Sequence, residues 1–180
     1  MCGPVGLAAT LLAKAAGARQ IIVVGAPEQR LAMARRLGAT DTIDMEVITS
    51  EADRVESVRD LTSGLGAEVV IEAAGAVNAF GEGIQLVAKN GRYVVVGLWS
   101  APGTAAVEPR YINNNNLQIM GSALYAPSHL HGAIQIAQQY HQTFPMADAV
   151  THRFSLDDTQ KALEAVARLE TVKAVIVPSL

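Results

Sequence analysis

Two glycines near the start of the chain, Gly3 and Gly6, have the spacing of the last two glycines in a G-x-G-x-x-G dinucleotide fingerprint. An Ala- and Leu-rich run follows Gly3 directly, and Pro4 suits the first helical turn, where its missing N–H is not needed. The N-terminus of such a helix offers free N–H groups and a positive dipole end to phosphates. The pattern therefore indicates a phosphate-binding turn, although a small-residue helix packed on a sheet fits it equally well.

The fingerprint is incomplete at its beginning. Met1 occupies the position of the first glycine, and the strand that should lead into the turn would lie before position 1. We therefore expect the sequence to begin inside a motif.

Other reactive side chains form no complete catalytic or metal-binding set. His129 and His131 are two residues apart at a predicted helix start, so they do not share a helical face as paired metal ligands would. Cys2 lies in the predicted turn, where we favour a small packed residue over a reactive thiol. Glu72 ends an apolar strand, and we favour a backbone-bonded carboxylate there over a general acid or base. The sequence predicts no catalytic residue and no metal site.

Composition narrows the class of protein. Half of the 180 residues are hydrophobic but only 4% are aromatic, which favours buried strands covered by Ala-rich helices. With 14 basic against 17 acidic residues and no basic run, we expect no nucleic-acid partner. The single cysteine excludes an internal disulfide, and no apolar stretch is long enough to span a membrane. We expect a cytoplasmic protein without a membrane partner.

Apolar runs and helical patterns alternate along the chain. Strands are predicted at 20–25, 40–44, 67–72, 92–97, 117–122, 150–154 and 173–177, and helices at 4–16, 26–37, 51–63, 77–88, 127–142 and 155–169. Continuously apolar strands such as 20–25 and 67–72 are typical of strands buried on both faces. Short connections in this order predict an α/β fold with a doubly wound, Rossmann-type parallel sheet that lacks its first strand.

Nearly the whole sequence resembles the zinc-type alcohol dehydrogenases of the medium-chain dehydrogenase/reductase superfamily. The resemblance is carried, in order, by residues 3–7, 13–18, 30–31 with Ala34, 37–39, 69–75, 91–97, 161–163 and 173–177.

The resemblance implies that catalysis and cofactor binding are carried by two separate domains. In such enzymes a separate, mainly N-terminal domain carries the catalytic zinc ligands and most of the substrate pocket. Residues 1–145 then resemble the NAD(P)-binding domain, and residues 146–180 the segment that returns to the other domain. The implied reaction is hydride transfer between an alcohol or carbonyl substrate and nicotinamide. Zinc would be bound only in the complete enzyme, and we expect the isolated chain to be inactive. Relatives pair through the edge of the cofactor sheet, so a homodimer through the 92–108 region is expected.

The resemblance also assigns cofactor contacts. It places the pyrophosphate at the first turn and near Lys173, for which a solvated lysine is an equal alternative. It places the nicotinamide beside the ends of the fourth and fifth strands of the complete sheet, and the carboxamide beyond the following strand. The implied residues are Gly3, Pro4, Val5 and Gly6; Ala73, Ala74, Val96, Gly97 and Leu98; Ser122 and Leu124; and Lys173.

The choice between NAD and NADP stays open. Gly25 ends the strand where NAD-preferring members place an aspartate that binds the adenosine ribose. Its absence removes a charge that would repel a 2′-phosphate, and Arg30 follows five residues later. Glu28 is also close and offers a ribose contact.

The sequence also fits, or argues against, several other classes of protein. A zinc-independent quinone or enoyl reductase of the same superfamily fits equally, because the distinguishing ligands would lie outside this sequence. A non-catalytic dinucleotide-binding module is a further alternative. A methyltransferase is expected to have an acidic residue that binds a ribose at the position of Gly25. A short-chain dehydrogenase is expected to have a Tyr-x-x-x-Lys motif, which this sequence lacks.

Overall fold

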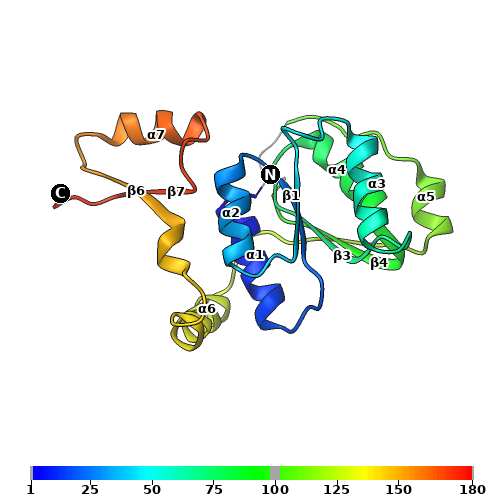
Figure 1. The fold of residues 1–180 in the computed structure, drawn as a ribbon, viewed down its shortest axis with the longest axis horizontal. Coiled ribbons are helices and arrows are strands. Elements are labelled where there is room, and N and C mark those ends of the chain that lie inside the picture. Colours follow the sequence, from blue (N-terminus) through cyan, green and yellow to red (C-terminus); the bar gives the residue numbers. More distant parts are fainter. Residues whose placement is uncertain (1, 98–101, 180) are drawn as a thin grey trace.

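The computed structural model describes residues 2–97 and 102–179. Helices and strands alternate along the chain as the sequence predicts (Figure 1). In order they are α1 (Pro4–Ala15), β1 (Ile22–Gly25), α2 (Glu28–Arg36), β2 (Asp41–Asp44), α3 (Glu51–Leu61), β3 (Ala67–Glu72), α4 (Val77–Leu86), β4 (Val87–Val95), α5 (Pro109–Asn114), β5 (Gln118–Gly121), α6 (Pro127–Tyr140), the 3-10 turn η1 (Met146–Ala149), β6 (Val150–Phe154), α7 (Thr159–Ala167) and β7 (Lys173–Ile176).

Every strand pair in the described structure is parallel. β1 pairs with β2, β4 pairs with β3 on one side and β5 on the other, and β6 pairs with β7. Helices α1 and α2 pack together beside β1, whereas α3 and α4 pack together on the other side of the strands (Figure 1). The predicted α/β class and parallel, Rossmann-type arrangement are confirmed.

The strands do not form one continuous sheet. Neither β1 nor β3 has a second strand partner among the described residues, so their inner edges face a groove. The prediction that β3 is buried on both faces is wrong, because Val69 is 45% exposed and Ile71 is 44% exposed. The sequence of β3 suits a central strand, but no neighbour covers its inner edge.

Two apolar clusters hold the body together. On one side, Leu7 and Leu11 of α1 pack with Leu31 of α2 and with Leu37, which follows that helix. On the other, Ile84 of α4 packs against β4 in a smaller cluster that contains the fully buried Tyr93. One core therefore joins α1 and α2, and a separate core fixes α4 to β4.

Two boundaries differ from the sequence prediction. The fourth helix ends at Leu86, and β4 begins at Val87, five residues earlier than expected. Asn90 adopts a left-handed backbone conformation with φ 61°, which folds the chain tightly instead of extending the helix. The short helix α5 lies between the predicted strands 92–97 and 117–122, where the sequence predicted no helix.

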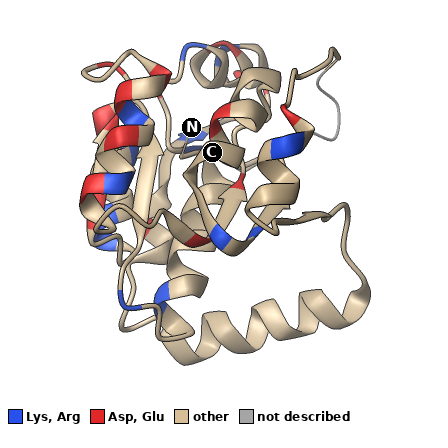
Figure 2. Cartoon of the chain, turned by 90° about the vertical axis from the view of Figure 1, so that its right-hand side faces the viewer, with Lys and Arg blue, Asp and Glu red and all other residues tan. Residues whose placement is uncertain are grey.

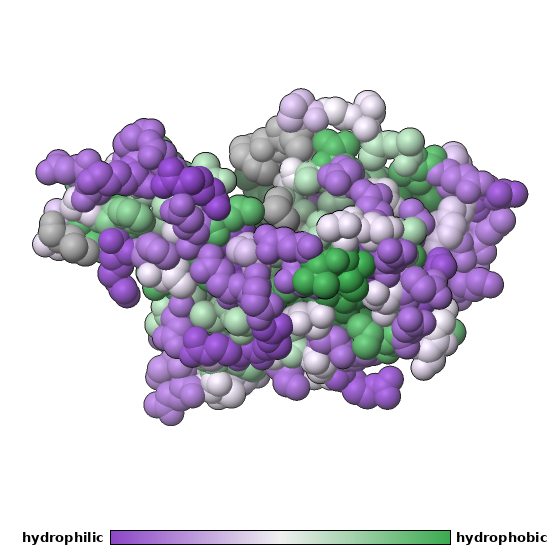
Figure 3. All heavy atoms as spheres, turned by 45° about the horizontal axis from the view of Figure 1, so that its top comes forward, coloured by the Kyte–Doolittle hydropathy of each residue, from purple (hydrophilic) through white to green (hydrophobic). Residues whose placement is uncertain are grey.

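At the left of Figure 1, β6 and β7 form a separate two-stranded sheet on which α7 packs through β7, and these elements are called the C-terminal unit below. This unit contacts α2 through a hydrogen bond from Gln29 to the carbonyl of Leu169 and an ion pair between Arg36 and Asp148. Hydrophilic side chains cover most of its visible surface in Figure 3, while more apolar patches appear on the larger body. The predicted division at residue 145 stays a prediction.

Charge is distributed unevenly over the helices. Acidic and basic side chains alternate along α3, whereas α6, the long helix at the bottom of Figure 2, carries no charged residue. No described helix is both long and apolar enough to cross a bilayer.

Candidate functional site

The first turn of α1 is open in front of its predicted phosphate-binding residues. Gly3 is the N-terminal cap in an extended conformation, and Pro4 begins the helix. A Cβ added to Gly3 would meet no atom within 4 Å. Val5 is 54% exposed on the same turn. Free N–H groups of a first turn that face open space are suited to bind an anion.

The end of β1 touches the start of α1. A Cβ on Gly25 would lie 2.8 Å from both the backbone N and the Sγ of Cys2, so only glycine fits this contact. Cys2 is itself buried, and burial raises the pKa of its thiol above the usual range. Cys2 thus serves as a small packed residue, as the sequence interpretation favoured, and keeps the chain before α1 against β1.

A buried carboxylate organises the turns that follow β3 and β4. The Oε1 atom of Glu72 accepts hydrogen bonds from the backbone N–H groups of Ala74 at 2.6 Å and Gly75 at 2.9 Å. Its Oε2 atom accepts one from the N–H of Gly97 at 3.1 Å. Only 5% of Glu72 is exposed. One side chain therefore fixes the two predicted nicotinamide-lining turns relative to each other.

These two turns are in tight contact. Gly75 has φ +70°, a conformation that favours glycine. A Cβ on Gly97 would lie 2.6 Å from the backbone N of Gly75 and 2.9 Å from that of Ala74. The glycines let the ends of β3 and β4 approach closely, so Ala73, Ala74 and Gly97 lie together. Val96 joins the same turn through a hydrogen bond from its N–H to the Glu72 carbonyl.

A single large cavity, of about 1610 Å³, joins the two groups of residues described above. Cys2 and Gly6 line it on the α1 side, and Glu72, Ala73 and Ala74 line it on the β3 side. The cavity runs along the length of β1 and β3, since Gln20 and Ala67 near their amino ends line it too, and among the predicted site residues it is lined by Gly6, Ala73 and Ala74.

Arg30 and Lys173 lie outside that cavity's lining. The guanidinium of Arg30 is buried and donates two hydrogen bonds to the carbonyl oxygen of Thr171, from Nε at 3.1 Å and from Nη2 at 2.8 Å. Lys173 is exposed at the start of β7. Arg30 therefore joins α2 to the C-terminal unit, a contact that sequence analysis did not predict.

The remaining predicted contacts follow β5 or lie outside the described residues. The N–H of Ser122 donates to the carbonyl of Val95 at 2.9 Å, which places Ser122 beside the end of β4. Leu124 has a left-handed backbone and is 89% exposed. Leu98 falls outside the residues that the structure describes.

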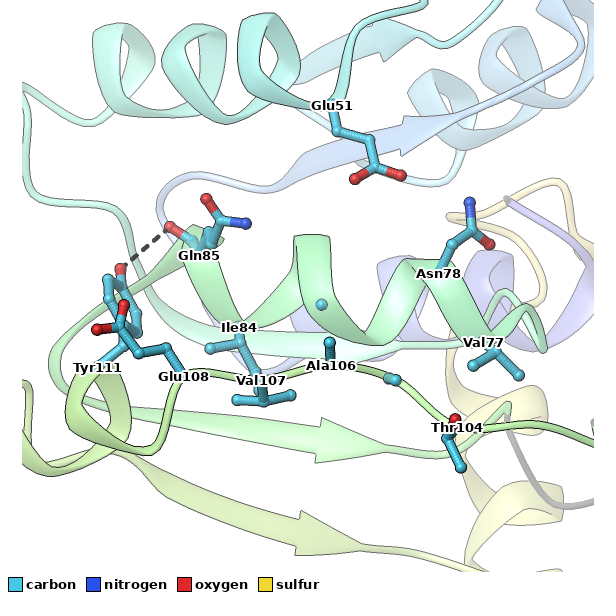
Figure 4. A pocket seen from close by; sticks show the side chains of 12 residues that line it. Glu51, Val77, Asn78, Ile84, Gln85, Thr104, Ala106, Val107, Glu108 and Tyr111 are labelled. Carbon is cyan, nitrogen blue, oxygen red and sulfur yellow. Dashed lines mark hydrogen bonds between the residues drawn. The ribbon is translucent and has the colours of Figure 1, made fainter.

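A second, smaller cavity of about 680 Å³ lies between α4 and the segment that leads into α5 (Figure 4). Asn78 and Gln85 line it from α4, and Glu51 and Glu108 add carboxylates from opposite sides. None of the predicted site residues lines this cavity, so it is separate from the candidate site.

Sequence analysis did not predict the pairings of the buried charges. Arg54 of α3 and Glu82 of α4 form a bidentate ion pair with N···O distances of 2.7 and 2.8 Å. For Glu72, by contrast, its position at a strand end led us to favour a carboxylate bonded to the backbone, as the structure shows. Within residues 2–97 and 102–179, no three His, Cys, Asp or Glu side chains are grouped so that they could hold a metal ion.

Together, the parallel strands and the glycine turn at the start of α1 define a Rossmann-type nucleotide-binding fold. Comparison with known families agrees, since residues 4–139 match the model of the zinc-binding dehydrogenase family. This chain belongs to that family.

Individual relatives support the assignment. The chain is 45% identical over 174 residues to a 5-exo-hydroxycamphor dehydrogenase from Pseudomonas putida, covering 97% of this chain and 48% of that protein. It is 33% identical to an erythritol/L-threitol dehydrogenase from Mycolicibacterium smegmatis, covering 99% of this chain and 47% of that protein. The chain thus spans about half the length of the curated relatives it matches.

Solved structures show the same fold. An alcohol dehydrogenase from Thermotoga maritima superposes with a TM-score of 0.88 at 28% identity, covering 98% of this chain and 48% of that one. Benzyl alcohol dehydrogenase from Acinetobacter calcoaceticus gives a TM-score of 0.84 at 27% identity, covering 97% and 47%. The predicted family resemblance is confirmed.

Proposed function

We propose that this chain is the NAD(P)-binding part of a zinc-type, alcohol dehydrogenase-like oxidoreductase. The observation that carries the proposal is the open first turn of α1 beside the turn that Glu72 holds at the end of β3. Dinucleotides bind outside the carboxyl ends of such strands. The pyrophosphate fits the turn at Gly3, where a Cβ would fill free space.

The chain's own residues would bind and orient the cofactor. The backbone N–H groups of the first turn of α1 would bind the pyrophosphate. The turns after β3 and β4 would lie beside the nicotinamide, with Glu72 setting their separation. We assign the cofactor contacts to the residues that the sequence predicts: Gly3, Pro4, Val5, Gly6, Gly25, Arg30, Ala73, Ala74, Val96, Gly97, Leu98, Ser122, Leu124 and Lys173.

Cofactor preference stays open between NAD and NADP. Gly25 offers no carboxylate to the adenosine ribose, so no negative charge at this position repels the 2′-phosphate of NADP or binds the ribose of NAD. Glu28 forms an ion pair with Arg35, and Arg30 bonds the Thr171 carbonyl, so both predicted preference residues have partners inside the chain. Either would have to exchange that partner for the ribose or its 2′-phosphate.

In the whole enzyme, bound nicotinamide would accept or donate the hydride, and zinc held by residues outside this chain would polarise the alcohol or carbonyl oxygen. We infer that this chain alone does not catalyse the reaction and that its alcohol or carbonyl substrate binds mainly to other residues. Sugar-alcohol and hydroxycamphor dehydrogenases among the relatives are consistent with a small alcohol substrate.

We also propose a cytoplasmic homodimer that pairs through the sheet edge and includes the 92–108 region, although residues 92–95 belong to β4, which lies between β3 and β5. The outer edge of β5 has no strand partner among the described residues, and Ile119 and Met120 are 38% and 43% exposed there. A second copy would cover this edge. Light scattering at high protein concentration tests the proposal, and a monomer would reject it.

Titration of the chain with NADH and with NADPH, followed by nicotinamide fluorescence, tests cofactor binding. We expect weak binding of at least one cofactor. Gly3→Ala should weaken it by at least about tenfold, since its methyl group would occupy the approach to the pyrophosphate. Gly132→Ala in α6 is the matched control, because its Cβ would also meet no atom within 4 Å but lies on another helix. No fluorescence change at millimolar cofactor would contradict the proposal.

A further inference from the structure

The chain bulges out of the sheet just after the start of β4. Ala67 of β3 pairs with Val87 of β4. The next pairing joins Val69 to Arg92, so β4 advances from 87 to 92 while β3 advances only from 67 to 69. Residues 88–91 therefore leave the ladder between the two strands and form a bulge.

Two residues of this bulge, Asn90 and Gly91, are of the types that its backbone requires. Asn90 is exposed and has φ 61°, a left-handed conformation that asparagine adopts more readily than most residues. A Cβ on Gly91 would lie 2.6 Å from Cγ1 of Val87 and 2.7 Å from the carbonyl oxygen of Ala88, so only glycine fits there. The fold therefore imposes an Asn-Gly dipeptide on an exposed bulge.

An Asn-Gly dipeptide is chemically reactive. Asparagine is thermolabile, because the backbone nitrogen of the next residue can attack the Cγ atom of its side-chain amide. Glycine has no side chain to shield that nitrogen or to restrict the backbone rotation that the attack needs. Asn90 and Gly91 thus combine a side-chain amide with an unshielded nucleophile.

A contact from the segment before β5 favours this attack. Nδ2 of Asn116 donates a hydrogen bond to Oδ1 of Asn90 at 3.2 Å. The N–H of Asn90 donates in turn to the carbonyl of Asn115 at 2.8 Å, which holds the two segments together. Attack on Cγ places negative charge on Oδ1, and an N–H donor already directed at that oxygen stabilises the charge.

We propose that Asn90 is a site of spontaneous deamidation, in which the backbone nitrogen of Gly91 attacks Cγ of Asn90. A base from solvent takes the proton of that nitrogen as the N–Cγ bond forms. The tetrahedral intermediate then breaks its Cγ–Nδ2 bond and releases ammonia, which leaves a cyclic succinimide. Water opens the ring at one carbonyl to give aspartate and at the other to give isoaspartate. Nothing is oxidised or reduced, and water is the only co-reactant.

The two products differ in their effect on the bulge. Aspartate keeps the main chain as it is, and its carboxylate can still accept from Asn116. Isoaspartate adds a carbon atom to the main chain beside Gly91, where backbone and side-chain atoms leave no free space. The bulge lies near the amino end of β4, whereas the candidate cofactor site follows the carboxyl ends of the strands. The inference therefore does not require that the chain bind NAD(P).

Tryptic mapping of the folded chain, aged in mildly alkaline buffer, tests the proposal. Cleavage after Lys89 and Arg92 releases Asn90 in a tripeptide, which is compared with synthetic Asn-Gly-Arg, Asp-Gly-Arg and isoaspartyl-Gly-Arg by chromatography and mass spectrometry. We expect both aspartyl products. Asn116 is the internal control, because it is also exposed and left-handed, with φ 50°, but precedes Leu117. Asn90 should convert at least about tenfold faster than Asn116.

Two matched variants test the contribution of Asn116. Asn116→Asp keeps the size of the side chain but removes the N–H donor, and it should slow the conversion of Asn90 by at least about threefold. Asn114→Asp adds the same charge two residues away at an exposed position and should leave the rate unchanged, since among the described residues only Asn116 donates a side-chain hydrogen bond to Asn90. Circular dichroism verifies that both variants fold.

The unfolded peptide acetyl-Val-Ala-Lys-Asn-Gly-Arg-Tyr-amide sets the reference rate. Absence of product at Asn90 in the folded chain after this peptide has fully converted would overturn the proposal, and so would equal conversion of Asn116. An unchanged or faster rate in Asn116→Asp would overturn the part assigned to its N–H donor. Because these measurements contain no cofactor, their failure is distinguishable from failure of NAD(P) binding, which fluorescence reports separately.

Discussion

Two buried carboxylates in neighbouring regions use different kinds of partner. Glu82 of α4 is 6% exposed and pairs with the side chain of Arg54 on α3. Glu72 at the end of β3 is 5% exposed and accepts from three backbone N–H groups. A side-chain partner can be replaced together with its carboxylate, whereas backbone N–H groups cannot be removed. Glu82 therefore makes a contact between helices that could be replaced together with Arg54. Glu72 instead holds the backbone of the turns at the candidate cofactor site.

The largest effect is expected from breaking the ion pair between α3 and α4. Arg54→Ala would leave the Glu82 carboxylate buried without its partner and would remove hydrogen bonds to the carbonyls of Ile48 and Thr49. We expect a loss of about 3–5 kcal/mol in the free energy of unfolding. Urea unfolding followed by circular dichroism measures it.

Two controls sharpen this prediction. Arg59→Ala removes an exposed arginine on the same helix, 3.9 Å from Glu56, and should cost less than about 0.5 kcal/mol. The double change Arg54→Met with Glu82→Leu should recover most of the stability, because the pair is replaced as a unit. If the double variant is no more stable than Arg54→Ala, Glu82 is not replaceable and the contrast with Glu72 fails.

The next effect concerns Glu72 itself. Glu72→Gln removes the negative charge and one acceptor oxygen, so at least one of the three N–H groups loses its partner. We expect a cost of about 1.5–3 kcal/mol, together with shifted amide resonances for Ala74, Gly75 and Gly97. Two-dimensional NMR and urea unfolding together measure the two effects.

Glu68→Gln is the matched control for this change. Glu68 lies on the same strand but is exposed, and its neutralisation should change stability by less than about 0.5 kcal/mol. Unchanged resonances of the three turn residues in Glu72→Gln would show that backbone packing alone holds the turns.

The sequence predicted more of the fold than of these contacts. The alternation of strands and helices and the glycine turn before α1 could both be predicted, because each depends on a local sequence pattern. The pairing of Arg54 with Glu82 depends on how two helices dock, and neither residue has a local signal that distinguishes it from surface charge. The exposure of Val69 and Ile71 was mispredicted for a similar reason, since burial of a strand depends on its neighbours. Arg30 was assigned to the cofactor from its place after β1, but its bonds to Thr171 come from a segment far along the chain.

A smaller effect is expected from the close approach of the turns that Glu72 holds. Gly97→Ala would place a methyl group 2.6 Å from the backbone N of Gly75 and should cost about 1–3 kcal/mol, because backbone atoms must move. Gly121→Ala at the end of β5 is the control, since its Cβ would meet nothing within 4 Å. Equal thermal stability of the two variants would mean that the turns are not held in contact in solution.

The smallest expected effect is on the pKa of Tyr93, which responds to the charges of both Glu72 and Glu82. Tyr93 is fully buried, and burial first, then the charge of Glu72, then that of Glu82, raises the pKa of its phenol well above the usual value near 10. The unfolded chain therefore releases this proton at lower pH than the folded chain. Tyr93 contributes full stability below about pH 10, and that contribution is lost as the pH rises toward its folded-state pKa.

Tyr93→Phe should consequently show a shallower loss of stability above about pH 10, as measured by urea unfolding at stepped pH. Its hydroxyl also donates weakly to the carbonyl of Phe80 at 3.2 Å, so a cost of about 1 kcal/mol is expected at neutral pH. Glu72→Gln and Glu82→Gln should each lower the pKa of Tyr93, with Glu72→Gln giving the larger shift because its charge has the greater influence. Ultraviolet titration of the phenolate measures both shifts. A larger shift of the Tyr93 pKa in Glu82→Gln than in Glu72→Gln would contradict this prediction. It would mean that the charge of Glu82, in the ion pair between the helices, acts more strongly on Tyr93 than the charge of Glu72 does.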